Sequence, residues 1–170
     1  MKNTALVIVD MQEFFLKNFI PASRNILVAN QEKIIDLCVK NSAPTFLIEY
    51  KAGGVLRGKT IGKLSDKVKR ILKETIIKES NSAFTGTDLD KMLQDLNVRK
   101  IILMGINANG CVQDTTIGAL HRGYSVITSE GVIASSSRGD MSLSKRNKDW
   151  FARNTKFFSD FPQLLDYLAK

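Results

Sequence analysis

KIILMGINANGCVQDTTIGALHRG, residues 100–123, contains the clearest structural signal in the chain. It begins with a continuous apolar run at Lys100–Met104, which is typical of a strand buried on both faces of a sheet. A glycine-containing loop follows, and the spacing then predicts a helix over Cys111–Arg122 that ends at Gly123. A buried strand leading directly into a helix is the repeating unit of a parallel α/β sheet.

The same unit recurs on both sides of this stretch. Short apolar runs rich in β-branched residues predict strands at Ala5–Val9, Thr45–Ile48, Thr75–Ile77, Lys100–Met104, Tyr124–Thr128 and Thr155–Phe158. Helical periodicity predicts helices at Ser23–Val39, Ser65–Lys73, Asp88–Leu96, Cys111–Arg122 and Asp160–Leu168, with Ser23 and Thr87 as N-caps. The basic, glycine-containing segment Lys51–Lys63 is expected to be an exposed loop. The alternation predicts a single three-layer α/β/α domain over residues 1–170, with a six-stranded parallel sheet.

The bulk composition of the 170 residues excludes several classes of protein. With 44% hydrophobic and 25% charged residues, the chain is neither disordered nor fibrous. No apolar run approaches the ~20 residues that span a bilayer, so no membrane partner is expected. The run Ala5–Val9 ends at Asp10 without a signal-peptide cleavage site, and two dissimilar cysteines do not make a disulfide framework. A reducing cytoplasmic location is the natural expectation.

The unusual bulk property is a net charge of +8, which first suggests a nucleic acid or an acidic surface as the partner. However, the chain has no alternation of basic and aromatic residues and no nucleic-acid motif, so no nucleic-acid partner is expected. Part of the excess charge lies in two groups, one of Lys51, Arg57, Lys59 and Lys63 and the other of Lys145, Arg146, Lys148, Arg153 and Lys156.

Candidate functional residues follow the ends of the predicted strands, because ligands of parallel α/β sheets bind outside the carboxyl ends of the strands. They are Asp10, Glu49, Lys78 and the loop Gly105–Cys111. Cys111 is the sharpest candidate, since a thiol at a helix N-terminus meets unpaired N–H groups that favour the thiolate and could hold an oxyanion. The alternative is a small buried core residue.

Asp10 ends a strand that should be fully buried, so its carboxylate needs either water or a partner. A loop or capping acid is an equally good interpretation of Asp10, a solvated surface lysine is the alternative for Lys78, and Glu49 has a structural or supporting role by default. Cys38, on an apolar helix face, should be inert. His121 lies ~15 Å along the helix from Cys111 and is expected to be structural. No cluster of ligand residues predicts a metal or other cofactor.

Three segments together resemble the isochorismatase-like cysteine hydrolase superfamily. They are ALVIVDMQEFF at 5–15, IIKESNSAFTGTDLDKML at 76–93 and GINANGCVQDTTIGALHRGYSVIT at 105–128. The order of Asp, Lys and Cys at the ends of strands one, three and four is also similar, and the likeness covers nearly the whole chain.

The resemblance implies a catalytic triad of Cys111 as nucleophile, Asp10 as proton acceptor and Lys78 as the neighbouring cation. It further implies a cis peptide at Ile106–Asn107, an oxyanion hole made of the N–H groups of Asn107 and Cys111, and the strand order 3-2-1-4-5-6. In that order strands three and one are ~10 Å apart, so Lys78 must reach inward along the top of the sheet. Phe15, Tyr50 and Phe84 are expected to form the pocket wall, and relatives often form homo-oligomers.

The chain departs from parts of the superfamily in ways that bear on the substrate. The stretch IEYKAGGVLRGKT after the second strand has no histidine, which disfavours a metal-dependent nicotinamidase. The nucleophilic cysteine argues against the vinyl ether hydrolysis of isochorismatases proper. Gly131 stands where an Asp is common after strand five, which leaves the capping of that loop open.

These observations favour a metal-free cysteine hydrolase that cleaves a C–N bond in a small amide or carbamoyl compound through a thioester. A non-enzymatic basic binding protein on the same fold is one alternative, and a vinyl ether hydrolase is another. If the first basic group borders the pocket, the small-molecule substrate should be anionic.

Overall fold

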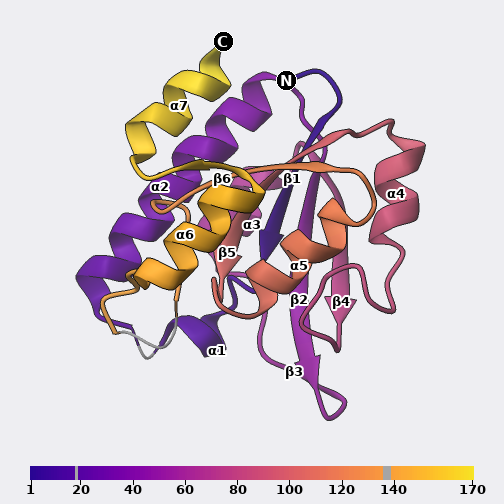
Figure 1. Cartoon of the computed structure of the whole chain (residues 1–170). Helices are drawn as coiled ribbons and strands as arrows, with labels where there is room; N and C mark the ends of the chain where they lie inside the picture. The colour runs from indigo at the N-terminus through magenta and orange to yellow at the C-terminus, as the bar shows by residue number, and fades with distance from the viewer. Residues whose placement is uncertain (18, 136–138) are drawn as a thin grey trace.

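The computed structural model describes residues 1–17, 19–135 and 139–170 (Figure 1). In these residues the chain folds around an eight-stranded sheet. Its strands are β1 (Thr4–Val9), β2 (Thr45–Ala52), β3 (Val55–Leu56), β4 (Leu72–Lys78), β5 (Lys100–Ile106), β6 (Ser125–Ser129), β7 (Ile133–Ala134) and β8 (Lys156–Phe158).

The predicted strands form a parallel sheet in the order β4-β2-β1-β5-β6-β8. This is the order 3-2-1-4-5-6 that the resemblance implies, and the α/β class is confirmed. The predicted number of strands is wrong, because two short strands extend the sheet. β3 folds back antiparallel on β2 through Gly53 and Gly54, both at positive φ, and the two-residue β7 pairs with the end of β5.

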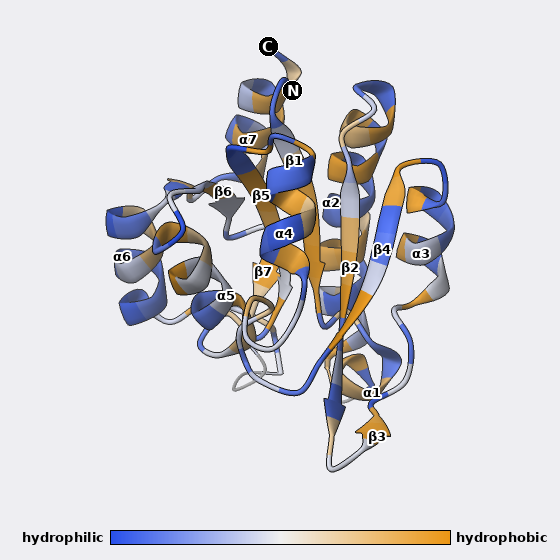
Figure 2. Ribbon diagram, turned by 90° about the vertical axis from the view of Figure 1, so that its right-hand side faces the viewer, coloured by the Kyte–Doolittle hydropathy of each residue, from blue (hydrophilic) through white to orange (hydrophobic). Residues whose placement is uncertain are grey.

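Helices cover both faces of this sheet. They are α1 (Glu13–Leu16), α2 (Pro21–Lys40), α3 (Gly62–Val68), α4 (Leu89–Asp95), α5 (Cys111–Leu120), α6 (Lys145–Asn154) and α7 (Phe161–Ala169). Figure 2 shows α2 and α3 on one side of the sheet and α5 and α6 on the other. α2 packs against both α3 and α7. The sheet therefore lies between two layers of helices. Within the described residues, no helix combines the length and the hydropathy that crossing a membrane requires.

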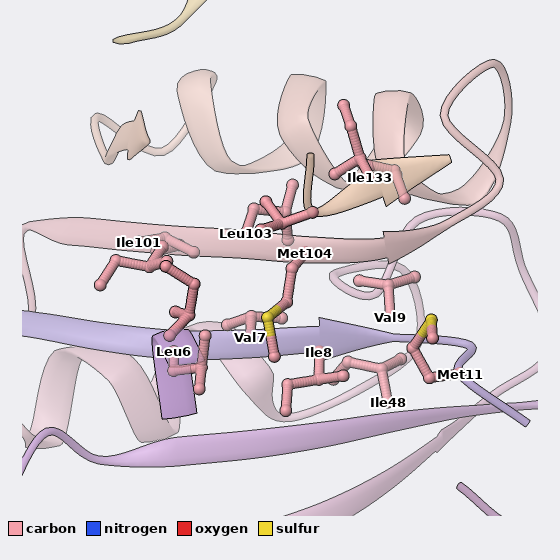
Figure 3. Packing of buried hydrophobic residues seen from close by; sticks show 14 of the residues in the cluster. Leu6, Val7, Ile8, Val9, Met11, Ile48, Ile101, Leu103, Met104 and Ile133 are labelled. Carbon is pink, nitrogen blue, oxygen red and sulfur yellow. The ribbon is translucent and has the colours of Figure 1, made fainter. Parts of the chain in front are cut away.

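The core lies where β1 passes between β2 and β5. All six residues of β1 are buried, as a strand covered on both faces should be. Figure 3 shows Leu6 and Ile8 of β1 among the side chains of Ile48, Ile101 and Met104 from the flanking strands. This rigid centre fixes the carboxyl ends of β1 and β5, from which the candidate site is built.

The predicted N-caps of two helices are each displaced. α2 begins at Pro21 with Ile20 as N-cap, so Ser23 lies inside the helix. Proline is suited to the first turn because its φ is already helical and its missing N–H needs no acceptor. α4 begins at Leu89 with Asp88 as N-cap, but the Thr87 hydroxyl still accepts a hydrogen bond from the Leu89 N–H at 3.4 Å and donates one to the carbonyl of Ala83.

The segment Lys51–Lys63 is not simply an exposed loop. β2 continues to Ala52, β3 returns along it, and Thr60 is buried, with its N–H donating to Glu49 Oε1 at 2.7 Å. The helix predicted at Ser65–Lys73 is also displaced. α3 spans Gly62–Val68, and the chain enters β4 at Leu72, where burial alternates as it does along an edge strand.

α6 carries most of the second basic group and was not predicted. Ser144 caps it by accepting a hydrogen bond from the Asn147 N–H, and Phe151 anchors it on the core. Its other side chains are mostly polar, so hydrophobic periodicity gives little signal. Lys145 pairs with Asp149 at 2.6 Å and Lys148 with Glu130 at 2.6 Å, so part of this positive charge is neutralised locally.

Two glycines are required by close approaches of the backbone. Gly105 has φ of 136°, and a Cβ there would lie 2.0 Å from the carbonyl oxygen of Val9, so only glycine lets β5 approach the end of β1. At Gly131 a Cβ would lie 2.6 Å from Cβ of Phe161, which leaves no room for an aspartate. That loop is instead held by Asn30, which donates to the Gly131 carbonyl at 3.0 Å, and by the Ser129 hydroxyl, which accepts from the Gly131 N–H at 3.1 Å.

Candidate active site

Asp10, Lys78 and Cys111 meet at one edge of the sheet. Asp10 directly follows β1, Lys78 is the last residue of β4, and Cys111 is the first residue of α5, just after β5. Parallel strands bring their carboxyl ends to the same edge, which explains why residues so far apart in sequence converge.

Lys78 spans the width of the intervening strand β2. It lies in register with Tyr50 of β2, and its ammonium group sits 4.7 Å from the centroid of the Tyr50 ring. From there Lys78 Nζ reaches Asp10 Oδ2 at 2.9 Å and donates to the carbonyl of Ser80 at 3.1 Å. Lys78 therefore reaches inward to Asp10, as the predicted strand order requires. Its ammonium group passes the ring of Tyr50, whose quadrupole stabilises a cation.

The Lys78–Asp10 ion pair is almost completely buried, with side-chain exposures of 0% and 3%. At Asp10 the backbone turns into the left-handed region, with φ of 53°, and its N–H donates to the carbonyl of Ile48. Burial raises the pKa of the Asp10 carboxyl, because it penalises the charged form, while the positive charge of Lys78 opposes that rise. Asp10 Oδ1 has no hydrogen-bond partner among the described residues.

Cys111 is partly buried, and the Asp10 carboxyl is close enough to influence its thiol. Burial, and then the negative charge of Asp10, raise the pKa of the Cys111 thiol to about 11, while Lys78 acts in the opposite direction. The helix N-terminus does not give the Cys111 thiol a low pKa in the resting site, because desolvation and the neighbouring carboxylate dominate.

The resting site is consequently best described as a neutral thiol beside a carboxylate that is held by a buried lysine. Moving one proton from Cys111 to Asp10 creates the thiolate and converts the Asp10 carboxylate into a neutral carboxylic acid in the same step. Because the two groups share an environment and influence each other, they titrate as a pair. An arrangement of this kind suits a nucleophile that is deprotonated only as it attacks.

Asn81 is a member of the site that sequence reasoning missed. Its side-chain Oδ1 lies 3.9 Å from Sγ of Cys111, within the range of a weak hydrogen bond donated by the thiol. It stands three residues after Lys78 in the segment that carries the resemblance, but nothing in its type or spacing set it apart. Its position follows from the turn after β4, which the strand pattern does not predict.

These residues surround a pocket of about 190 Å³, which is lined by Asp10, Phe15, Tyr50, Asn81, Ile106, Asn107 and Cys111. The Phe15 and Tyr50 rings lie side by side in its wall, with 6.2 Å between their centroids. Asp10 is the one charged side chain among the described lining residues. The volume suits a substrate of only a few heavy atoms beyond the reacting group.

The structure places Phe84 away from this pocket. It is buried behind α5, where its ring stacks on Tyr124 at 6.0 Å, and the guanidinium of Arg122 lies 5.0 Å from its centroid. A Cβ at Gly118 of α5 would lie 3.0 Å from the Phe84 ring, so Phe84 packs directly on that helix. It supports the helix that carries Cys111 instead of contacting the pocket.

The loop before α5 brings backbone groups to the thiol. The peptide bond between Ile106 and Asn107 is cis, and both residues line the pocket. The Asn107 carbonyl accepts hydrogen bonds from the N–H groups of Gly110 and Val112, each at 3.0 Å, which closes the loop onto the first turn of α5. The Cys111 N–H belongs to that first turn, whose N–H groups have no acceptor within the helix.

A buried amide side chain behind the pocket, that of Gln12, fixes the position of Tyr50. Gln12 is fully buried, and its Oε1 accepts from the Tyr50 N–H at 2.7 Å. Its Nε2 donates to the carbonyls of Tyr50 at 3.2 Å and Gly58 at 2.6 Å. Glu49, the neighbouring candidate from the sequence, accepts from Thr60 and does not line the pocket. Gln12 was missed, although it immediately follows Asp10 and Met11.

The remaining candidates lie apart. Cys38 is buried in α2, and burial raises the pKa of its thiol to about 12. His121 is the C-cap of α5, at the opposite end of the helix from Cys111. The described residues contain no group of three or more His, Cys, Asp or Glu side chains that could hold a metal ion.

None of the first basic group lines this pocket. Lys51 forms an ion pair with Glu79 at 2.7 Å, and the Arg57 guanidinium lies 5.2 Å from the centroid of the Phe14 ring. Lys63 faces a different cavity.

Comparison with known proteins identifies the family. The isochorismatase domain matches residues 4–152, which is most of the chain. Nicotinamidase 3 of Arabidopsis thaliana is 28% identical over 151 residues, covering 78% of this chain and 74% of that protein.

Solved structures share the fold. N-carbamoylsarcosine amidase from Thermoplasma acidophilum superposes with a TM-score of 0.76 at 23% identity, covering 91% of this chain and 93% of that one. A ribonuclease from Caenorhabditis elegans superposes with a TM-score of 0.80 at 23% identity, covering 98% of this chain and 81% of that one. One architecture therefore accommodates different activities, and the activity has to be argued from the site. On the domain match and the fold, this chain belongs to the isochorismatase family and is a hydrolase of the isochorismatase-like cysteine hydrolase superfamily.

Proposed function

We propose that the protein hydrolyses the C–N bond of a small neutral carboxamide or carbamoyl compound through a thioester on Cys111. The observation that carries the proposal is the buried Lys78–Asp10 ion pair beside a neutral thiol in one pocket. The likeness to a nicotinamidase and to an N-carbamoylsarcosine amidase, both named for substrates with such a bond, supports it.

The first half of the reaction forms the thioester. Sγ of Cys111 attacks the carbonyl carbon while its proton passes to the Asp10 carboxylate. The N–H groups of Asn107 and Cys111 would stabilise the oxyanion of the tetrahedral intermediate. As the C–N bond breaks, Asp10 gives its proton to the leaving nitrogen, and ammonia or an amine departs.

The second half returns the enzyme to its starting state. Asp10, again a carboxylate, takes a proton from water as the water oxygen attacks the thioester carbonyl. The C–S bond then breaks, the acid product leaves, and Asp10 returns the proton to sulfur. The positive charge of Lys78 favours the ionised form of Asp10 at the start of each half-reaction.

The lining of the pocket favours a neutral and partly planar substrate. Phe15 and Tyr50 offer aromatic surfaces, Asn81 offers an amide that can both donate and accept, and no cation lines the described part of the pocket. An anionic substrate, which the basic segment suggested, would have no positive partner among these lining residues.

Replacing the nucleophile tests the proposal. Cys111→Ala and Cys111→Ser should each abolish the release of ammonia or amine from a panel containing nicotinamide, N-carbamoylsarcosine and short aliphatic amides. Cys38→Ala is the matched control, because Cys38 is the other cysteine and lies buried in α2; this variant should retain turnover. Turnover that survived both changes at Cys111 would contradict the mechanism. Salt-sensitive binding of an RNA oligonucleotide without any amide turnover would instead favour a non-enzymatic basic binding protein.

A further inference from the structure

A second cavity, of about 430 Å³, lies on the other side of α1 from the catalytic pocket. Its lining comprises Glu13, Leu16, Lys17, Arg24, Asn25, Val28, Ile61, Gly62 and Lys63. The two linings share no residue: in α1, Phe15 lines the catalytic pocket, whereas Glu13, Leu16 and the C-cap residue Lys17 line the second cavity. The volume lies within the ~300–1,000 Å³ that small-molecule sites commonly occupy.

Three cations from separate parts of the chain line this cavity. Lys17 follows α1, Arg24 lies in the first turns of α2, and Lys63 lies at the beginning of α3. Glu13 is the one acid among the described lining residues, so the cavity has an excess of positive charge. Lys63 comes from the basic segment noted in the sequence, which the proposed reaction leaves without a role.

The charges of Arg24 and Lys63 are not neutralised by carboxylates in the described part of the chain, where neither residue forms an ion pair. Other lysines of the same region are paired: Lys67 of α3 contacts Asp36 at 2.6 Å, and Lys69 contacts Asp66 at 2.7 Å. Arg24 is in addition only half exposed, so water screens its charge less than it would at an open surface.

The floor of the cavity is apolar. Leu16 and Val28 are 1% and 5% exposed, and Ile61 packs against the core beside them. A ligand that fills this cavity therefore meets both cations and aliphatic carbon. That combination selects an amphipathic anion over a bare inorganic ion.

We propose that this cavity is a second binding site, which takes a small phosphomonoester with an apolar substituent. A phosphomonoester carries close to two negative charges at neutral pH and has three terminal oxygens, so Arg24 and Lys63 can each bind a separate oxygen. Lys17, whose ammonium lies 4.7 Å from the centroid of the Phe14 ring, adds positive charge to the same cavity. A carboxylate has one charge and two oxygens in a plane, which matches this set less well. The site does not depend on the chemistry proposed for Cys111.

Isothermal titration of the full-length protein with phenyl phosphate tests the site at low ionic strength. Phenyl phosphate should bind more tightly than either inorganic phosphate or benzoate, because only it has both the dianion and the ring. Arg24→Gln and Lys63→Gln should each weaken binding by about tenfold or more, which is typical for the loss of a charge-assisted hydrogen bond.

Arg70→Gln and Lys73→Gln are the matched controls, because both residues are exposed and neither lines the cavity. They remove the same formal charge and should leave the affinity unchanged. All four substitutions are at exposed or half-exposed positions, and far-UV circular dichroism should confirm unchanged folding. No binding of phenyl phosphate to the wild-type protein would overturn the proposal. Equal weakening in all four variants would also overturn it, because it would assign the attraction to the general positive charge of the protein.

Discussion

In the proposed mechanism, the Cys111 thiol is activated by transfer of its proton and not by a low pKa. Its pKa is raised to about 11 by burial and by the charge of Asp10, so very little thiolate exists at neutral pH. A reactive thiol in this setting depends on a base held within reach, and we propose that Asp10 is that base. The distinction matters because it separates reactivity toward an external alkylating agent from catalytic activity.

Asp10→Asn should therefore change these two properties in opposite directions. Removing the carboxylate eliminates a charge that raises the pKa of Cys111, so the thiol should ionise at lower pH and react faster with iodoacetamide at pH 8. Amide hydrolysis should fall by at least ~10³-fold, because both proton transfers lose their carrier. The pH dependence of alkylation, followed by mass spectrometry of the Cys111 peptide, measures the first effect. A Cys111 thiol that became less reactive in Asp10→Asn would contradict this interpretation.

Lys78→Met should cost about 3–5 kcal/mol of unfolding free energy at pH 7, because it leaves a buried carboxylate without its partner. The pKa of Asp10 would then rise further above its unfolded value of 3.8, since burial would act without the opposing charge. The folded state would bind a proton that the unfolded state has lost, so stability should rise as the pH falls through the folded pKa toward 3.8.

Urea unfolding at pH 7 and pH 5 measures both effects of Lys78→Met. The double variant Asp10→Asn/Lys78→Met should recover much of the lost stability at pH 7, because no unpaired charge remains. A single variant as stable at pH 7 as at pH 5 would show that Asp10 is not desolvated in the way the structure indicates.

At the scale of elements, the hairpin formed by β2 and β3 positions the aromatic wall of the pocket. Gln12 holds the base of this hairpin because its side chain accepts a hydrogen bond from the Tyr50 N–H and donates to the carbonyls of Tyr50 and Gly58. The Tyr50 ring then faces Phe15 and lies over the Lys78 ammonium. Gln12 is therefore a positioning residue, which acts on the pocket by fixing Tyr50.

Gln12→Ala should raise KM by about tenfold or more, while kcat changes less. The hydrogen bonds that fix Tyr50 would be lost, each with a cost of about 1–3 kcal/mol for a buried group left unsatisfied, but Cys111 and Asp10 would remain in place. Gln163→Ala is the control, because Gln163 is exposed on α7. Steady-state kinetics on the best amide of the panel would separate the two constants. An unchanged KM with a reduced kcat would contradict the positioning role.

Elements with strong hydrophobic patterns could be predicted from the sequence, and the others could not. β1 and β5 are apolar after their first residues, Thr4 and Lys100, because both faces of each strand are covered, so their residues identify them directly. α6 escaped prediction because it buries mainly Asn147 and Phe151 and is otherwise polar. β3 is two residues long and depends on pairing with β2, which no local pattern encodes.

The candidate site shows the same division. Asp10, Lys78 and Cys111 could be identified because they lie at or shortly after the carboxyl ends of predicted strands and match the motifs of the superfamily. Asn81 and Gln12 could not, because an amide in a turn or after a strand has no distinctive signal. Phe84 was misplaced because a sequence motif does not show which side of α5 an adjacent aromatic ring packs against.

On the scale of the whole molecule, the net charge is +8, but no lysine or arginine lines the described part of the catalytic pocket. Of the four cations of the basic segment, Lys51 pairs with Glu79, Arg57 lies against the ring of Phe14, and Lys63 lines the second cavity. The anionic preference predicted from the sequence therefore has no partner in the described pocket wall. The structure favours the uncharged member of a matched pair of substrates.

Benzamide and 4-carbamoylbenzoate form such a pair, because they differ only in a carboxylate. We expect kcat/KM for benzamide to equal or exceed that for 4-carbamoylbenzoate at low salt, where electrostatic attraction is strongest. A rate for 4-carbamoylbenzoate that was about tenfold higher and fell as salt was added would restore the anionic preference.

The thioester itself offers the most direct measurement. The protein is mixed with excess amide substrate, quenched in acid during turnover, digested and analysed by mass spectrometry. We predict an acyl group, equal in mass to the substrate less its amine, on the peptide that contains Cys111, and its absence from Cys111→Ser. Continued turnover by Cys111→Ser, or an acyl group found only on Cys38, would contradict the proposed mechanism.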